Sequence, residues 1–235
     1  MAQTSIRQNL LQIQEKIANA ANRAGRRPED ITVIGVSKTH PAIAIHEAYQ
    51  AGVRHFGENR VQEWEVKRVG TNNLAATWHL IGHLQSNKAA KAAKLFHTVD
   101  SVDDLAVAQK LDTARAQGGK LHILIEVRIA QEETKTGVEI RALPELAEKI
   151  AALPHLDLAG LMCIPPYLLE AEQVRPYFRR LRELREDLKT KLGLPLPVLS
   201  MGMSHDFEVA IEEGATEVRV GTALFGTRTA LPAKR

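Results

Sequence analysis

The sequence predicts an α/β fold, a single (β/α)8 barrel domain covering residues 1–235 with one extra helix at its N-terminus. Eight short apolar runs alternate with helical patterns, which is typical of βαβ units and a parallel sheet. The 235 residues are 44% hydrophobic, enough for a sizeable core at a length where such barrels form one domain. Neither GxGxxG nor GxxxxGK[ST] follows any run, which disfavours the rival architecture, a doubly wound open sheet.

The first element is the extra helix, predicted at roughly residues 3–24. Ile6, Leu10, Ile13 and Ile17 recur at three- to four-residue spacing, so they form one apolar face. The helix is expected to end near Gly25, before the first strand begins.

Eight strands follow in chain order. Each is followed by a helical stretch except the last, which is expected to lead into a short tail. The runs are ITVIGVSK (31–38), RHFGEN (54–59), TWHLIG (77–82), LFHTVD (95–100), LHILIEVRI (121–129), LDLAGLMCI (156–164), PVLSMG (197–202) and EVRVG (217–221).

Composition excludes several classes of protein. The net charge is +3, basic residues mostly alternate with acidic ones, and aromatic residues make up 4%, which gives little support to nucleic-acid binding. No run approaches eighteen apolar residues, and the amphipathic N-terminus does not resemble a signal peptide, so we expect a cytoplasmic protein without membrane contact. The single cysteine, Cys163, excludes an internal disulfide and is expected in the core.

In a (β/α)8 barrel the functional groups stand at the carboxyl ends of the strands, and phosphate is often held after strands seven and eight. Lys38 ends the first run, where a solvated lysine would be the ordinary interpretation. After the seventh run, Gly202 permits a close backbone approach and Ser204 stands at a helix start. After the eighth run, Gly221 and Thr222 repeat this chemistry. Helix capping would explain the residues of either loop alone. Two adjacent loops with the same chemistry favour a phosphate-binding site.

Side-chain alternation tests whether these residues face one ligand, because successive strand residues point to opposite sides. Lys38 shares a face with Val36, Ser200 with Gly202, and Arg219 with Gly221. The strand registers are mutually compatible and place an amine, a cation and a phosphate cradle at one mouth. A lysine in such a positive, desolvated site has a lowered pKa and condenses with aldehydes. Pyridoxal 5′-phosphate (PLP) fits this chemistry, and so does a sugar phosphate in a Schiff-base aldolase.

The segments VIGVSKTHP, HFGENRVQE, WHLIGHLQSNK, GLMCIPP, LSMGMSHDFEVAIEEG and VRVGTALFG resemble those of the pyridoxal phosphate homeostasis proteins, the YggS or PROSC family. The resemblance runs over essentially the whole chain. It implies the TIM barrel of the type III PLP fold, similar to the N-terminal barrel of alanine racemase but without its second β domain. It also implies a PLP carrier that serves apo-enzymes, and we expect this carrier to be a monomer.

Carried over residue by residue, the resemblance implies that Lys38 forms the internal aldimine, a Schiff base. Asn59 and Met162 would line the ring pocket, together with Val36 beside the lysine. Arg219 would lie near the ring nitrogen, with a phosphate contact left open. The phosphate would be held by Ser200, Gly202, Ser204, Gly221 and Thr222. Two positions depart from the expected pattern: Arg128, whose partner the sequence does not reveal, and Arg60.

Other tempting residues have ordinary interpretations. His79 and His83 would lie roughly 13 Å apart on a strand, so no metal site is expected. Asp100 and Asp103 are expected to be acids at the start of a helix. Ser204, His205 and Asp206 imitate a catalytic triad on paper, but neighbours in one helical turn do not adopt triad geometry.

The sequence leaves three functions open: a PLP carrier without turnover, a racemase-like enzyme, and a Schiff-base aldolase. The carrier is favoured and no catalytic residue is assigned. A racemase needs a tyrosine base opposite the lysine, whereas Tyr49 and Tyr177 lie in helical stretches and Tyr167 could only overhang the mouth. An aldolase lysine normally ends the sixth strand, where this sequence has Met162.

Overall fold

The computed structural model describes residues 5–130 and 136–226 of the chain. Eight parallel strands form a closed ring, because β4 pairs with β5 in addition to the chain of pairs that runs from β4 through β1 and β9 to β5. The strands of the ring are β1 (Thr32–Val36), β2 (His55–Glu58), β3 (Thr77–Leu80), β4 (Thr98–Val102), β5 (Leu121–Arg128), β7 (Leu156–Met162), β8 (Val198–Met203) and β9 (Glu217–Val220). The predicted barrel is confirmed.

A two-residue strand, β6 (Val138–Glu139), pairs with the end of β5 outside the ring. This strand supplies the partner of Arg128 that the sequence did not reveal: Arg128 Nη2 donates to Glu139 Oε1 at 2.7 Å. Arg128 therefore joins the β5 end to this short strand.

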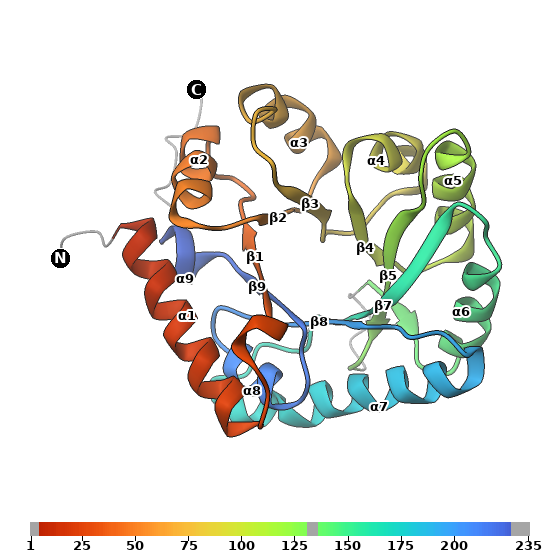
Figure 1. The fold of residues 1–235 in the computed structure, drawn as a ribbon. Helices are drawn as coiled ribbons and strands as arrows, with labels where there is room; N and C mark the ends of the chain where they lie inside the picture. The colour runs from red at the N-terminus through yellow and green to blue at the C-terminus, as the bar shows by residue number, and fades with distance from the viewer. Residues whose placement is uncertain (1–4, 131–135, 227–235) are drawn as a thin grey trace.

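Helices surround the ring (Figure 1). They are α1 (Ile6–Arg23), α2 (Ala42–Ala51), α3 (Val61–Lys67), α4 (Ala89–Leu95), α5 (Leu105–Arg115), α6 (Leu143–Ala151), α7 (Arg175–Leu192), α8 (Phe207–Glu212) and α9 (Thr222–Phe225), with short 3-10 turns at Pro28–Asp30, Arg68–Gly70, Ser86–Lys88 and Ala171–Val174. The expected tail after the last strand is wrong in one respect, since α9 adds a helical turn directly after β9. None of the helices in the described ranges is both long and apolar enough to cross a membrane.

The extra helix α1 begins at Ile6, three residues after the predicted start, and has the expected apolar face. A capping box fixes its start: Gln8 N donates to Ser5 Oγ at 3.2 Å, and Ser5 N donates to Gln8 Oε1 at 3.1 Å. Leu10, Ile13 and Ile17 are buried, and α1 lies against α8, α9 and α2. The buried amide of Asn9 donates to the carbonyl oxygen of Leu224 at 2.9 Å, which fastens α1 to α9.

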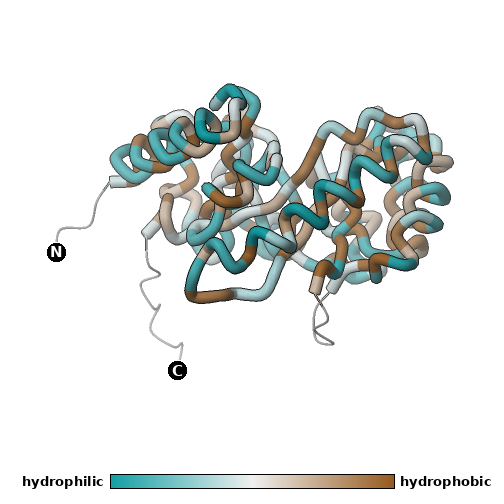
Figure 2. The backbone as a smooth tube through the Cα atoms, turned by 90° about the horizontal axis from the view of Figure 1, so that it is seen from below, coloured by the Kyte–Doolittle hydropathy of each residue, from teal (hydrophilic) through white to brown (hydrophobic). Residues whose placement is uncertain are grey.

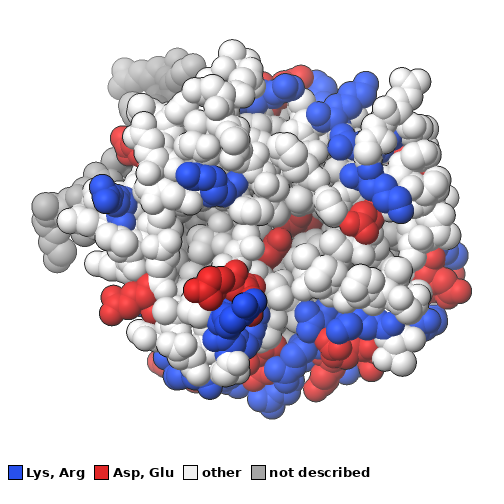
Figure 3. Space-filling model, in the orientation of Figure 1, with Lys and Arg blue, Asp and Glu red and all other residues white. Residues whose placement is uncertain are grey.

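The main apolar core lies between the strands and the helices, and the tube in Figure 2 shows helices with alternating apolar and polar residues around it. Trp64 of α3 stacks on Trp78 of β3 with ring centroids 3.8 Å apart. Cys163 is fully buried, as predicted. Charged side chains gather on the outside, and acidic and basic atoms alternate along the lower rim in Figure 3, where α7 lies.

Candidate functional site

A pocket of about 640 Å³ opens at the carboxyl ends of the strands. It brings together seven of the ten residues that the sequence singled out. They are Val36, Lys38, Asn59, Ser204, Arg219, Gly221 and Thr222. The remaining wall includes Ile81 and Ile164, and the exposed ring of Tyr167 lies beside the His205 ring, tilted to it by 39° with centroids 5.3 Å apart. One pocket thus combines an amine, a guanidinium and a hydroxyl-rich loop pair.

The other three predicted residues lie outside the wall of this pocket. Met162 and Ser200 are completely buried, and Ser200 Oγ accepts a hydrogen bond from Arg219. Gly202 has φ of +92°, and a Cβ there would lie 2.6 Å from Ala210 Cβ. A glycine is therefore required at position 202 for the tight approach of β8 to α8, whether or not this residue contacts a ligand.

Lys38 follows β1 at a sharp turn. The next residue, Thr39, has φ of +67°, an unusual conformation for a residue with a side chain. The Thr39 N–H donates to Glu63 Oε1 at 2.5 Å, which helps to hold the turn. The position of the lysine at the mouth is thus fixed by the turn at Thr39 and by the contact of this turn with α3.

Lys67, which the sequence analysis missed, is the centre of that support. Its Nζ donates to the Ser37 carbonyl oxygen at 2.9 Å and contacts Glu58 Oε1 and Glu63 Oε1 at 2.7 and 2.9 Å. Burial raises the pKa of Glu58, although Lys67 and Ser37 oppose the shift. The available signal was Glu58 itself, a carboxylate at the end of an apolar strand that needs a cationic partner.

Arg219 projects from β9 and is almost fully buried. Its Nη1 donates to Ser200 Oγ and its Nη2 to the Cys163 carbonyl oxygen, both at 2.8 Å. Both acceptors are uncharged, so they orient the guanidinium without neutralising it. Arg219 therefore brings an oriented guanidinium to the wall of the pocket.

The loops after β8 and β9 meet at Ser204. Its Oγ accepts hydrogen bonds from the backbone N–H groups of Gly221 at 3.2 Å and Ala223 at 3.3 Å. Backbone donors from the last loop therefore already converge on an oxygen atom at the mouth, as a phosphate cradle requires. The supposed triad does not form: His205 Nε2 bonds to the Leu169 carbonyl oxygen, and Asp206 Oδ1 accepts from Met203 N.

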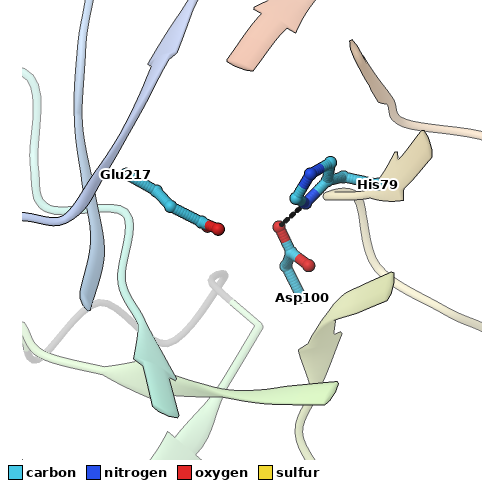
Figure 4. Close-up of side chains that lie close together, drawn as sticks. All are labelled: His79, Asp100 and Glu217. Atoms are coloured by element: carbon cyan, nitrogen blue, oxygen red, sulfur yellow. Dashed lines mark hydrogen bonds and ion pairs between the residues drawn. The ribbon is translucent and has the colours of Figure 1, made fainter. Parts of the chain in front are cut away.

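A second group of polar side chains lies inside the barrel, where His79 from β3, Asp100 from β4 and Glu217 from β9 converge (Figure 4). His79 Nδ1 and Asp100 Oδ2 are 3.1 Å apart, and one ligand atom from each of the three residues lies within 4.8 Å of the others. A histidine and two carboxylates could hold a metal ion. The prediction for Asp100 is wrong: it is buried in a strand, and Asp104 caps α5 instead.

Burial and mutual contact shift the pKa values of this interior cluster. Burial and the nearby Asp100 carboxylate raise the pKa of Glu217 to about 7. Burial alone would lower the pKa of His79, but Asp100 outweighs it and the pKa is raised. His55, 3.0 Å from His79 Nε2, has its pKa lowered to about 4 by burial and by His79. A charged His79 beside Asp100 and a protonated Glu217 fit these directions.

Residues 8–229 match the model of the family described as alanine racemase, N-terminal domain. Pyridoxal phosphate homeostasis proteins of Aquifex aeolicus and Pseudomonas aeruginosa are 46% and 45% identical to the chain. The matches cover 94% and 96% of this chain, and 97% and 96% of those relatives. The chain belongs to the alanine racemase N-terminal domain family, together with these homeostasis proteins. The resemblance predicted from the sequence motifs is confirmed.

Solved structures of the family agree with this assignment. PipY of Synechococcus elongatus, solved with PLP bound, is 41% identical, with a TM-score of 0.80 over 89% of this chain and 100% of that chain. An alanine racemase of Clostridium difficile is 19% identical, with a TM-score of 0.72 over 96% of this chain and 57% of that chain. This second likeness shows a shared barrel fold.

Proposed function

We propose that this protein binds PLP at Lys38 and keeps it available to other proteins without turning over amino acids. The observation that carries the proposal is the single pocket that contains Lys38, Arg219 and the Ser204 loop. The aldehyde of PLP matches Lys38, and its phosphate matches the Ser204 loop. Its aromatic nitrogen or an anionic group matches Arg219. The structure of the relative PipY with PLP bound supports the same ligand.

The residues of the pocket fit the cofactor. Ser204, Gly221 and Thr222 would hold the phosphate, because hydroxyl and backbone N–H donors converge there. Asn59 and Val36 would contact the ring, and Met162, Ser200 and Gly202 would support the site from behind. When bound, PLP supplies an aldehyde that combines with primary amines, and Lys38 is the lysine in the wall of this pocket.

The absence of turnover in this proposal has a physical basis. A guanidinium gives up its proton very reluctantly, so Arg219 at the ring nitrogen would leave that nitrogen unprotonated and make it a poor electron sink. Tyr167, on the open rim, is 73% exposed to solvent, so it lacks the burial and fixed orientation that a catalytic base needs. The names of the relatives support a homeostasis role. We propose that apo-enzymes are the recipients and that the carrier works as a monomer.

Absorption spectroscopy and mass spectrometry test the attachment. Purified protein mixed with PLP should turn yellow, and borohydride reduction followed by peptide mapping should place the cofactor on Lys38. Lys38→Ala should lose the reducible adduct, whereas Lys94→Ala on the outer face of the barrel should keep it. Mapping of the cofactor to another lysine would contradict the site.

Two further measurements separate the parts of the proposal. Unphosphorylated pyridoxal should bind weaker by orders of magnitude, because each charge-assisted hydrogen bond contributes about 1.5–3 kcal/mol. Incubation of the loaded protein with L-amino acids in deuterated water should give no Lys38-dependent exchange at the α-carbon. Exchange at the rate of an enzyme would favour the racemase-like alternative.

A further inference from the structure

A second cavity of about 610 Å³ lies beside the cofactor pocket, at the carboxyl ends of β2 and β3. The two motifs FGENRVQE and IGHLQSNK build it, and the proposed cofactor site uses only Asn59 and Ile81 from them. Asn59 belongs to the wall of both cavities. The lining residues are Asn59, Arg60, Val61, Gln62, Gly82, His83, Leu84, Gln85 and Lys88.

The charge of this cavity has one sign. Arg60 and Lys88 contribute cations, His83 adds an imidazole, and the lining contains no carboxylate. Within residues 5–130 and 136–226, neither Arg60 nor Lys88 forms a salt bridge, in contrast to the arginines of α7. His83 Nδ1 lies 3.4 Å from Asp103 Oδ2, and Asp103 stands outside the cavity.

The wall between the cavities is rigid. A Cβ on Gly82 would lie 2.4 Å from the carbonyl oxygen of Asn59, so the two loops touch backbone to backbone. The Ile81 N–H donates to the Glu58 carbonyl oxygen at 3.0 Å, and Ser101 Oγ donates to the Gly82 carbonyl oxygen at 2.7 Å. The cavity is therefore formed before any ligand binds, which is usual for small-molecule sites.

A third cavity provides an internal comparison. It measures about 480 Å³ and also contains one arginine, one lysine and one histidine, namely Arg68, Lys94 and His97. It lies at the amino ends of β3 and β4, whereas barrels bind ligands at the carboxyl ends. The number of side-chain amides also differs: Asn59, Gln62 and Gln85 line the cavity beside the cofactor pocket, whereas Asn72 is the one amide among the residues that line the third cavity.

We propose that the Arg60–Lys88 cavity binds the phosphate group of a second small molecule, next to the cofactor. Two cations that line one cavity match a group that carries about −1.5 to −2 charge at neutral pH. Three side-chain amides can donate to its remaining oxygens, more donors than a single carboxylate needs. The volume admits a molecule of the size of a nucleotide or a cofactor. This site stands independently of the function proposed for Lys38.

Isothermal titration calorimetry with inorganic pyrophosphate tests the proposal, on the full chain with and without saturating PLP. Pyrophosphate should bind in both states. The double variant Arg60→Gln/Lys88→Gln should weaken binding at least about tenfold, because it removes two charge-assisted contacts. The matched variant Arg68→Gln/Lys94→Gln should bind like the original protein. Urea unfolding of both variants verifies that each remains folded.

Three results would overturn the proposal. Equal weakening in both double variants would show general attraction of an anion to positive charge. Binding only without PLP would place pyrophosphate in the cofactor's own phosphate cradle. Citrate binding as tightly as pyrophosphate would show that the cavity does not select a phosphate group.

Discussion

Two clusters of ionisable side chains, one inside the barrel and one outside it, stabilise their buried carboxyl groups in different ways. Inside, His79 and Asp100 are 2% and 1% exposed and stand beside Glu217, which is partly buried. Outside, Glu213 after α8 is surrounded by three arginines of α7, at distances of 3.0 to 3.2 Å. The interior cluster shares protons, whereas the exterior cluster pairs a buried carboxylate with arginines that are partly exposed to solvent.

The difference appears in the direction of the pKa shifts. Burial raises the pKa of Glu217 to about 7, so protonated and ionised forms of this acid coexist near neutral pH. Burial would also raise the pKa of Glu213, but Arg179 and Arg175 outweigh it and the pKa is lowered. A buried carboxyl is thus charged only where cations contact it directly. Arg219 does not do this for Glu217, because its hydrogen bonds go to Ser200 and Cys163.

The largest effect is expected from Asp100→Ala. Removal of one partner leaves His79 buried without its counter-charge, which costs about 3–5 kcal/mol of the free energy of unfolding. Urea unfolding measures this loss. The double variant His79→Leu/Asp100→Leu, which removes both groups, should recover at least half of it. A double variant as unstable as the single one would show that packing, and not charge, dominates the interior.

Glu217→Gln is expected to have a smaller effect that depends on pH. Because the folded pKa of about 7 lies above the unfolded value, the contribution of Glu217 is fully present below about pH 4.5 and is lost as pH rises through 7. The amide has no such loss, so the variant should be more stable than the original protein by about 1–3 kcal/mol at pH 8. Unfolding at pH 5 and pH 8 should show the gain only at the higher pH.

Glu213→Gln is expected to destabilise by about 1–2 kcal/mol at neutral pH, since three arginines lose their shared partner. Its pH dependence has the opposite sign to that of Glu217. The folded pKa is lowered, so the stabilisation is present above the unfolded pKa and is lost as pH falls through the folded value. Added salt at about 0.5 M should shrink the effect. A loss of stability that does not change with added salt would contradict the screening of these ion pairs by dissolved ions.

Arg179→Ala should have the smallest effect, with a urea midpoint indistinguishable from that of the original protein. Arg179 is 53% exposed, and Arg175 and Arg182 continue to contact Glu213 when it is removed. A clear loss of stability would mean that the exterior cluster behaves like the interior one.

The sequence by itself determined the barrel and the pocket that faces its carboxyl end. Strand runs at regular spacing fix which residues point inward, so Lys38, Arg219 and Gly221 could be placed at one mouth before any coordinates. Only the tertiary structure decided which of the predicted residues reach the pocket. Ser200 points to the expected side of its strand, but it lies deep in the barrel and accepts a hydrogen bond from Arg219 instead of lining the pocket. The alternation of side chains along a strand carries no information about this depth.

Contacts between distant segments were likewise decided by the tertiary structure alone. Asp100 was expected at a helix start because a local pattern of acids is typical of caps, but its partner His79 stands on the neighbouring strand, 21 residues away. Lys67 supports the Lys38 turn from a helix 30 residues further along the chain. Local periodicity follows from backbone geometry and is written in the sequence. Pairing across the barrel depends on strand register and closure, which only the folded chain fixes.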